Sequence, residues 1–173
     1  MTTQSSQNKT YLSMSVLTVS DTRTEETDRS GRLLAEALVA EGHSLHEKSI
    51  LKDDRYLIRA KLSEWIANEK VNAVLITGGT GFANRDVTPE AVRPLLDKEI
   101  PGFGEVFRYL SYDEIGSSTM QSRAFAGLAN RTFIFCMPGS TSACQLAWEK
   151  ILQPQFDQSN KPCNIVDIMP YID

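Results

Sequence analysis

Histidine and cysteine are scarce in this chain, and their scarcity excludes several kinds of site. The 173 residues include two histidines and three cysteines. His43 and His46 have no evident triad partner, and we expect both at the surface. Cys136, Cys144 and Cys163 are odd in number and lack C-x-x-C spacing, so neither a zinc site nor a disulfide framework is expected. Cys136 lies in an apolar run and is expected to be a buried, unreactive thiol.

Long apolar runs and an excess of basic charge are also absent. The sequence contains no run of 18 apolar residues, the length needed to span a membrane. The first ten residues are polar and lack the apolar core of a secretory signal. The chain has 18 basic and 22 acidic residues, a net charge of −4, so it lacks the electrostatic footprint of a nucleic-acid-binding protein. We expect a reduced, cytoplasmic protein that binds neither nucleic acid nor membrane.

Apolar runs alternate with segments of helical periodicity along most of the chain. In residues 54–69, for example, apolar side chains recur at the i, i+4, i+7 and i+8 spacing of one helix face. Strands are expected at 15–20, 45–51, 73–77 and 132–137, and helices at 30–41, 54–69, 102–110, 120–129 and 140–152, with a short helix beginning near Thr88. Such alternation predicts an α/β fold with three layers, a mostly parallel central sheet between helices.

The chain divides into a tail, one domain and an extension. We expect residues 1–12 to be a flexible tail, residues 13–157 to form the domain, and residues 158–173 to be a C-terminal extension. The extension is apolar and carries two prolines. It could form an edge strand on its own sheet or an arm that embraces a neighbouring subunit. Thr88 and Ser140 are candidate helix N-caps.

A glycine-rich loop follows the third expected strand. Gly78, Gly79, Thr80 and Gly81 form a turn that side chains do not fill, so backbone N–H groups could approach a phosphate or a pterin closely. The loop is neither a Walker A motif nor a Gly-x-Gly-x-x-Gly fingerprint. Taken alone, it could equally be a tight turn between a strand and a helix.

Four motifs occur together in a fixed order. They are Thr-Gly-Gly-Thr-Gly (77–81), Arg-Asp-Val-Thr-Pro-Glu-Ala (85–91), Pro-Gly-Phe-Gly-Glu (101–105) and Met-Pro-Gly-Ser (137–140). Together they resemble the MoaB/MogA family of molybdenum cofactor biosynthesis, closest to its MoaB branch, over residues 14–155. The resemblance implies a molybdopterin-binding fold. For active members it implies transfer of AMP from Mg-ATP to the terminal phosphate of molybdopterin, with release of pyrophosphate.

Polar motifs also follow the expected strands, at residues 20–22, 52–54, 78–81 and 138–140. In open α/β sheets, ligands bind beyond the carboxyl ends of the strands. The four motifs should therefore meet at one edge of the sheet. This geometric argument is independent of the family resemblance.

Two acids are the candidate catalytic and Mg²⁺-binding residues, Asp53 and Asp86. Adenylyl transfer depends on positioning and charge neutralisation, and the acceptor phosphate is already ionised, so no strong base is needed. The resemblance matches both acids to family acids. Alternatively, Asp53 could cap the following helix, although Asp54 could do so instead. Asp86 could serve only in a side-chain turn.

The remaining candidates are assigned to substrate binding, partly through the resemblance. They are Ser20, Asp21, Gly78, Gly79, Thr80, Gly81, Glu105, Ser122, Arg123, Pro138, Gly139 and Ser140. The alternatives are turn formation at 20–21, N-capping at Ser140 and a solvated helix face at 122–123. Arg85 and Arg108 could clamp phosphate or be ordinary surface charges.

Several readings of function remain open. The chain could be an enzyme that uses Mg²⁺, ATP and molybdopterin, or a non-catalytic molybdopterin- or nucleotide-binding protein. A Rossmann oxidoreductase is disfavoured because the glycine loop follows the third strand rather than the first. A pyridine-nucleotide salvage enzyme would need a second domain. The resemblance also implies a homotrimer or hexamer and, as a partner, the molybdate-inserting enzyme of the same pathway.

Overall fold

A computed structural model describes residues 9–172, and residues 1–8 of the expected tail lie outside this range. Within it, six strands form one sheet in the order β2-β1-β3-β6-β5-β4. Strands β1, β2, β3 and β6 are parallel, and β5 runs antiparallel to both β6 and β4. The strand bounds are Ser13–Val19 (β1), Ser44–Leu51 (β2), Ala73–Thr77 (β3), Lys98–Glu99 (β4), Phe125–Ala129 (β5) and Thr132–Met137 (β6).

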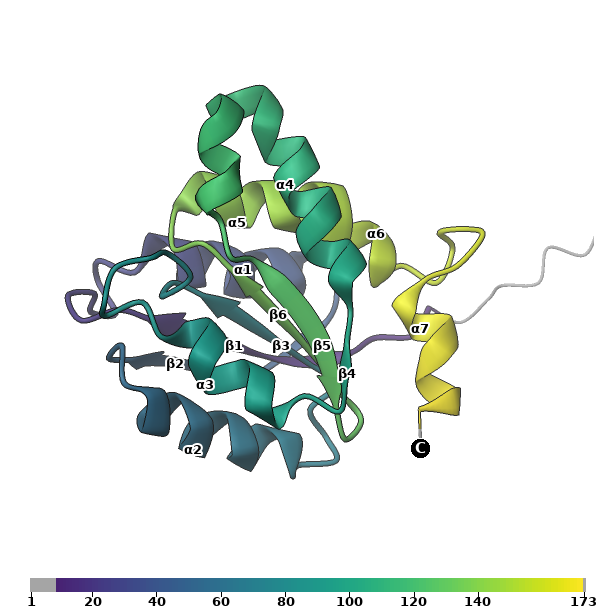
Figure 1. Ribbon diagram of the computed structural model, residues 1–173. Coiled ribbons are helices and arrows are strands. Elements are labelled where there is room, and N and C mark those ends of the chain that lie inside the picture. Colours follow the sequence, from purple (N-terminus) through teal and green to yellow (C-terminus); the bar gives the residue numbers. More distant parts are fainter. Residues whose placement is uncertain (1–8, 173) are drawn as a thin grey trace, which may run out of the picture.

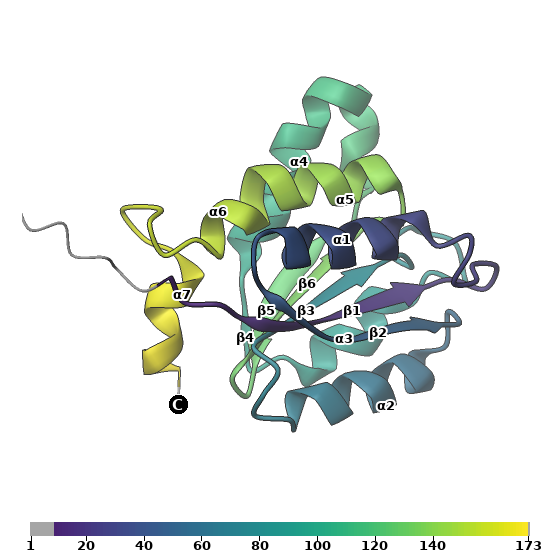
Figure 2. The ribbon, with the colours of Figure 1, turned by 180° about the vertical axis from the view of Figure 1, so that it is seen from behind.

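Helices cover both faces of the sheet, which confirms the predicted α/β/α layers (Figures 1 and 2). One layer contains α1 (Arg29–Ala40), α4 (Pro101–Ile115) and α5 (Thr141–Ala147), and the other contains α2 (Arg55–Ile66) and α3 (Thr88–Val92). Short elements complete the chain: η1 (Arg93–Leu95), η2 (Gly116–Gln121), the π-turn η3 (Trp148–Leu152), α6 (Gln153–Gln155), α7 (Ile165–Ile168) and η4 (Met169–Tyr171).

The central strands are apolar on both faces because both faces are covered. In β3, Ala73 and Leu75 pack in the core beneath α1 and α4, whereas Val74 and Ile76 pack against the α2 layer. Side chains alternate between the two faces of a strand, so one short apolar run contributes to both cores. Each fully buried Leu or Ile contributes about 1.5–3 kcal/mol. These cores hold the carboxyl ends of the strands in fixed register.

The prediction of a helix at residues 120–129 is wrong. The chain instead leaves η2 at Gln121 and enters β5, which pairs with β6 through a two-residue turn at Asn130. Asn130 has a φ of 53°, the left-handed conformation that Asn tolerates in hairpins. The segment Phe-Ala-Gly-Leu-Ala has no β-branched residue, and tertiary pairing overrides its weak local preference.

Three smaller expectations had mixed outcomes. Ser140 is confirmed as an N-cap, because its hydroxyl accepts from the N–H of Ala143. Thr88 is not a cap, since its hydroxyl donates to the carbonyl of Gly78. His43 is buried rather than exposed, and its Nδ1 accepts from the N–H of Leu12. His46 is exposed, as expected.

The C-terminal segment is helical and packs on the chain's own core. Asn164 caps α7 by accepting from the N–H of Asp167. Ile165 and Val166 are buried in the core shared with α1 and α5. The segment is therefore not an edge strand, and burial of these two side chains explains part of its apolar content. No helix among residues 9–172 is long and apolar enough to cross a membrane.

Candidate functional site

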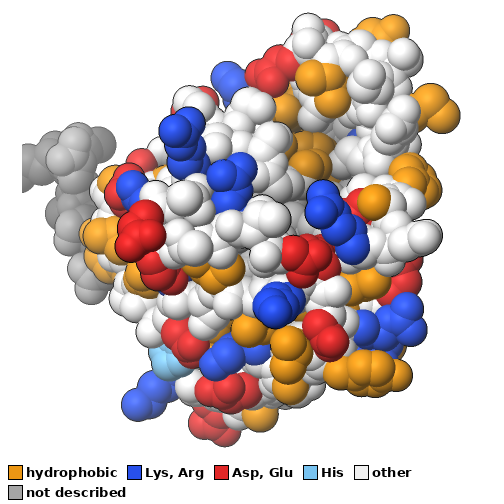
Figure 3. Space-filling view, turned by 90° about the vertical axis from the view of Figure 1, so that its left-hand side faces the viewer, with side chains coloured by type: hydrophobic (Ala, Val, Ile, Leu, Met, Phe, Trp, Pro, Cys, Tyr) orange, Lys and Arg blue, Asp and Glu red, His pale blue; other side chains and the backbone are white. Residues whose placement is uncertain are grey.

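The carboxyl ends of four parallel strands meet at one edge of the sheet, as the four polar motifs predicted. β2 ends at Leu51, β1 at Val19, β3 at Thr77 and β6 at Met137, and these residues are close in register. The chain crosses from β1 to β2 on one side and returns to β3 on the other, so the crevice between β1 and β3 is the switch point where such sheets bind ligands. Figure 3 views this edge, where acidic and basic side chains are interspersed.

Asp53 lies in this crevice and is not the helix cap. Asp54 caps α2 by accepting from the N–H groups of Tyr56 and Leu57. The N–H of Asp53 donates to Oδ1 of Asp21 at 3.2 Å. Among the described residues, the buried Oδ1 of Asp53 has no hydrogen-bond partner. The N-cap alternative for Asp53 is therefore excluded.

The electrostatic environment of Asp53 is unfavourable for its charged form. Burial, the carboxylate of Asp21 and the carboxylate of Asp86 raise the pKa of Asp53 to about 6, and Arg85 opposes them only partly. An ionised carboxylate with an unsatisfied buried oxygen is costly unless a cation or a donor joins it. The position is typical of a functional carboxylate.

The glycine loop passes directly over this carboxylate. Gly78 and Gly79 have φ values of 104° and 64°, which side chains rarely adopt. A Cβ at Gly79 would lie 2.8 Å from Oδ1 of Asp53 and 2.3 Å from Oγ1 of Thr88, and one at Gly78 would lie 2.2 Å from the carbonyl oxygen of Val19. Only glycine fits here without displacing neighbours.

Most backbone N–H groups of the glycine loop have no acceptor within residues 9–172. The N–H of Gly78 donates to Met137. No protein acceptor among the described residues is found for the N–H groups of Gly79, Thr80, Gly81 or Phe82. Unpaired amides in such a turn are suited to binding an anion.

Asp86 faces the same loop and forms the side-chain turn that was considered as an alternative for it. Its Oδ2 accepts from the N–H of Ala83 at 2.8 Å, so the side-chain turn is present. A Cβ at Gly81 would lie 2.7 Å from that oxygen. No hydrogen bond to Oδ1 of Asp86 is found among the described residues, so the second oxygen can still receive a cation.

The other rim residues are held in turns. The hydroxyl of Ser20 accepts from the N–H groups of Thr22 and Arg23, which is the turn alternative for that residue. Gly139 lies against Gly78, since a Cβ there would approach the Gly78 Cα to 3.3 Å. The Pro138–Ser140 turn therefore borders the glycine loop, with the N-terminus of α5 behind it.

The remaining predicted residues lie at a second place. Glu105, Ser122 and Arg123 line a hollow of about 540 Å³ between α3, α4 and β5. Ser122 and Arg123 are in the link before β5, so their expected helical position is wrong. Arg123 connects the two places, because it lines the hollow and donates to the loop carbonyls of Thr80 and Gly81.

The two arginines proposed as phosphate clamps differ. Arg108 donates through one nitrogen to the carbonyls of Ser122 and Ala124 at 3.4 and 2.9 Å, so it braces the chain beside the hollow. Arg85 is exposed and lies close enough to Asp53 to lower its pKa. Arg85 is therefore the better placed of the two for contact with a bound phosphate.

Comparison with known proteins gives the family. The family described as "Probable molybdopterin binding domain" matches residues 15–158. Molybdenum cofactor biosynthesis protein B of Escherichia coli K12 is 56% identical over 151 residues, which cover 87% of this chain and 89% of that protein. The chain belongs to the MoaB/MogA family.

Solved structures of MoaB/MogA proteins share the fold. A crystal structure of a molybdenum cofactor biosynthesis protein B superposes with a TM-score of 0.83 at 49% identity, covering 86% of this chain and 93% of that one. The tungsten cofactor synthesizing protein MoaB of Pyrococcus furiosus gives 0.77 at 34% identity, covering 94% and 97%. The fold expected from the resemblance is confirmed.

Sequence reasoning missed a fully buried acid, Asp28, near the same rim of this MoaB/MogA chain. Asp28 caps α1, and its Oδ2 lies 2.9 Å from Nζ of Lys48 and accepts from the hydroxyl of Thr18. Burial tends to raise the pKa of Asp28, but the hydrogen bonds from Lys48, the N–H of Gly31 and Thr18 lower it overall. An Asp directly before a segment of helical periodicity was the available signal.

The carboxylate oxygens at the rim fit Mg²⁺ only if a bound ligand supplies further oxygen atoms to the ion. Among residues 9–172, no three His, Cys, Asp or Glu side chains form a group that could hold a metal alone. Mg²⁺ commonly takes one or two carboxylates and completes its shell with phosphate oxygens and water. The unpartnered Oδ1 of Asp53 and the second oxygen of Asp86 are hard donors of this kind.

Proposed function

We propose that this protein acts in molybdenum cofactor biosynthesis by transferring AMP from Mg-ATP to the terminal phosphate of molybdopterin, releasing pyrophosphate. The proposal extends to this chain what the names of its relatives indicate about their pathway. One observation carries the choice of site: the buried Oδ1 of Asp53, which has no hydrogen-bond partner among the described residues, lies beneath a loop in which the N–H groups of residues 79–82 have no acceptor within residues 9–172.

Each part of the rim has a task in such a transfer. The N–H groups of the glycine loop would hold phosphate oxygens, and Arg85 would add positive charge from the solvent side. Asp53 and Asp86 would hold Mg²⁺, which when bound neutralises phosphate charge. The acceptor phosphate attacks the α-phosphorus of ATP, the bond to pyrophosphate breaks, and no proton needs to be removed from the nucleophile at neutral pH.

The glycine loop limits what can bind beside Asp53. Because no side chain fits between Gly79 and the side chains of Thr88 and Asp53, the backbone of the glycine loop lies close to the carboxylate of Asp53. The turn at Pro138–Ser140 adds the N-terminus of α5, where unpaired N–H groups and the helix dipole favour an anion. We infer that the molybdopterin phosphate lies between these two turns.

The test is incubation of the purified protein with molybdopterin, ATP and Mg²⁺, with detection of adenylylated molybdopterin and pyrophosphate. We expect both products in equal amounts. Tight binding of molybdopterin without either product would instead support a non-catalytic binding protein. Absence of binding to both substrates would refute the site.

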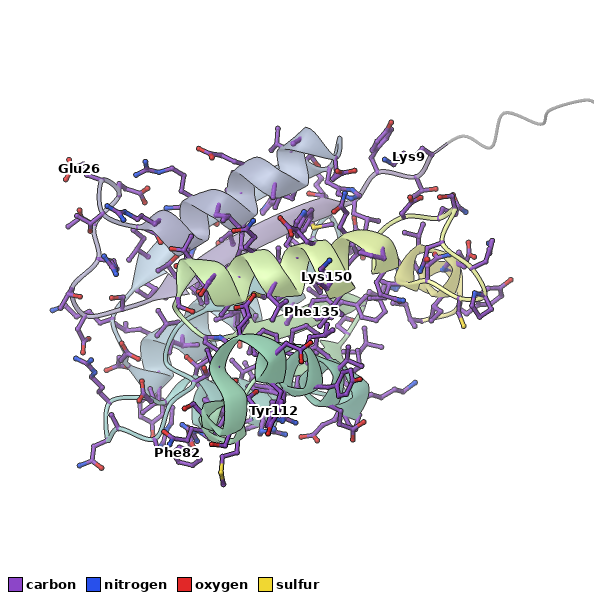
Figure 4. The ribbon with its side chains drawn as sticks, turned by 90° about the horizontal axis from the view of Figure 1, so that it is seen from above. Lys9, Glu26, Phe82, Tyr112, Phe135 and Lys150 are labelled. Carbon is purple, nitrogen blue, oxygen red and sulfur yellow. The ribbon has the colours of Figure 1, made fainter. Side chains whose placement is uncertain are left out.

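We also propose a closed homo-oligomer, a trimer or a hexamer. Exposed apolar side chains lie along α4 and η2: Val106, Tyr109, Tyr112, Ile115 and Met120. Hydrophobic side chains gather at the upper right of Figure 3, at the α4 end of the molecule. Figure 4 shows Tyr112 on the same side of the molecule as Phe82. A stripe of neighbouring apolar side chains differs from the single exposed apolar residues that are normal on a protein surface, and it is typical of an interface between proteins. Light scattering should give a trimer or a hexamer, a Tyr109→Glu variant should weaken it, and a wild-type monomer would contradict the proposal.

A further inference from the structure

Arg123 is enclosed by the glycine loop rather than directed to solvent. Its Nε donates to the carbonyls of Thr80 and Gly81 at 3.3 and 2.9 Å, and its terminal nitrogen Nη2 donates to those of Gly81 and Asp86 at 2.6 and 2.8 Å. The other terminal nitrogen forms an ion pair with Glu90. All three guanidinium nitrogens are therefore occupied by the protein.

The ring of Phe82 completes this enclosure. The guanidinium carbon of Arg123 lies 5.4 Å from the centre of that ring, within the range of a cation–π contact. Three carbonyl oxygens that point at one place repel one another unless a cation lies between them. Arg123 supplies that cation, and its planar fork matches several acceptors at once.

Because peptide bonds are planar, these contacts also fix the direction in which the N–H groups of the loop point. In a trans peptide the C=O and the following N–H point in opposite directions. Because the carbonyls of Thr80 and Gly81 point at Arg123, the N–H groups of Gly81 and Phe82 point away from it. These two N–H groups are among those with no partner within residues 9–172.

We propose that Arg123 is a positioning residue: it turns the unpaired N–H groups of the glycine loop toward the ligand and does not itself bind substrate. This revises its assignment as a substrate-binding residue. The proposal deepens the proposed function, on which its nucleotide readout rests. The arrangement of the loop does not depend on that function and can be measured in the free protein.

A neighbouring arginine, Arg93, provides a matched control. Arg93 lines the same hollow, pairs with Glu99 at 2.5 Å and lies over the ring of Phe125. Within residues 9–172, Arg93 forms no hydrogen bond, ion pair or ring contact with residues 78–86. An Arg93→Ala variant therefore removes an arginine and its ion pair from the hollow without touching the loop.

The experiment compares Arg123→Lys, Arg123→Ala and Arg93→Ala with the wild type in two measurements. The first is amide hydrogen exchange of Ala83 and Asp86 in free protein, because their N–H groups close the loop by donating to Asp86 Oδ2 and to the Ala83 carbonyl. The second is the Kd for Mg·ATP, measured by calorimetry. Thermal unfolding checks that each variant is folded, and methylguanidinium is added to Arg123→Ala.

We expect both Arg123 variants to speed exchange at these two amides and to raise the Kd by about tenfold or more, a loss of about 1.4 kcal/mol. Lysine should fail because a single ammonium cannot match the fork, and methylguanidinium should restore part of the affinity in Arg123→Ala. Arg93→Ala should match the wild type. If Arg123→Ala does not fold, Arg123→Lys alone decides both measurements.

Wild-type exchange and Kd in Arg123→Lys, or equal changes in Arg93→Ala, would overturn the positioning role. Faster exchange throughout β1 and β3 without rescue would also overturn it, because Arg123 would then serve the fold in general. If the wild type itself fails to bind Mg·ATP, the proposed function is refuted, while the exchange measurement still decides the role of Arg123.

Discussion

Two carboxylates, one buried and one partly buried, lie near the same edge of the sheet, and their surroundings are opposite. Asp28 has a lysine, a hydroxyl and a backbone N–H as partners, and its pKa is lowered. Asp53 has an oxygen without a partner and two acidic neighbours, and its pKa is raised to about 6. Under the proposed function, this difference separates an acid that stabilises the fold from an acid that would bind a ligand.

The loops around the two acids fit this contrast. The loop at residues 20–28 carries Glu25 as a second partner of Lys48, at 2.8 Å, so the charges beside Asp28 are paired within the protein. The glycine loop has N–H groups without an acceptor among the described residues, close to Asp53. Figure 4 shows that Glu26 and Phe82, one from each loop, lie at the same end of the molecule on opposite sides. Paired charges on one side and unpaired N–H groups on the other therefore flank one crevice.

The largest expected effect is on catalysis. Asp86→Asn keeps an oxygen to accept from the N–H of Ala83 but removes the charge that a cation needs. AMP transfer should fall by about 100-fold or more, about 2.7 kcal/mol of transition-state stabilisation. Thermal unfolding should change little. Measured turnover equal to that of the wild type would remove Asp86 from the catalytic site.

An isosteric change at the satisfied acid should act on stability instead. Asp28→Asn leaves the half-buried Lys48 without one of its two carboxylate partners. It should lower the free energy of unfolding by about 2 kcal/mol, a value reduced because Glu25 remains. Urea denaturation measures the loss. If Asp28→Asn were as stable as the wild type, the structural role assigned to this pair would be wrong.

A methyl group beside Asp53 tests the space above it. Gly79→Ala forces a side chain to a φ of 64° and against Thr88 and Asp53, which should cost about 1–2 kcal/mol. It should also weaken Mg·ATP binding in the folded protein. Gly102→Ala is the control, because a Cβ there meets nothing within 4 Å. Equal nucleotide affinity in both variants would exclude the glycine loop from the site.

The smallest predicted change in stability is an increase rather than a loss. Asp53→Asn should lower activity but raise stability at pH 7 by about 1 kcal/mol after allowance for solvent screening. The pKa of Asp53 is raised on folding, so the ionised form opposes the fold. The advantage of the variant should be full above the folded pKa of about 6 and shrink as pH falls through that value. It should vanish below the unfolded value of 3.8. A stability loss at pH 7 would show that Asp53 is a structural acid like Asp28.

The sequence predicted the rim better than it predicted the edge of the sheet. The runs at 73–77 and 132–137 are long, apolar and β-branched or aromatic, so both strands were placed with their correct bounds. The motifs that follow the strands then predicted which acids and glycines meet. Strand β5 was missed because its residues have no strong preference and its pairing with β6 is a tertiary effect.

Some site features lie beyond sequence reasoning for a physical reason. The choice between Asp53 and Asp54 as the helix cap depends on backbone conformation, which adjacent identical residues do not reveal. The enclosure of Arg123 joins residues 42 positions apart in the chain, and only packing brings them together. The ion pair of Asp28 with Lys48 is non-local for the same reason.

The most direct test of the account is the carboxyl titration of Asp53 and Asp28, followed by carbon NMR in free protein and with Mg·ATP. The account predicts that Asp53 titrates near pH 6 in the free protein and that its pKa falls markedly with Mg·ATP, while the pKa of Asp28 stays low in both. An Asp53 that titrates at its ordinary pH and does not respond to Mg·ATP would contradict the claim that this acid is held for a ligand.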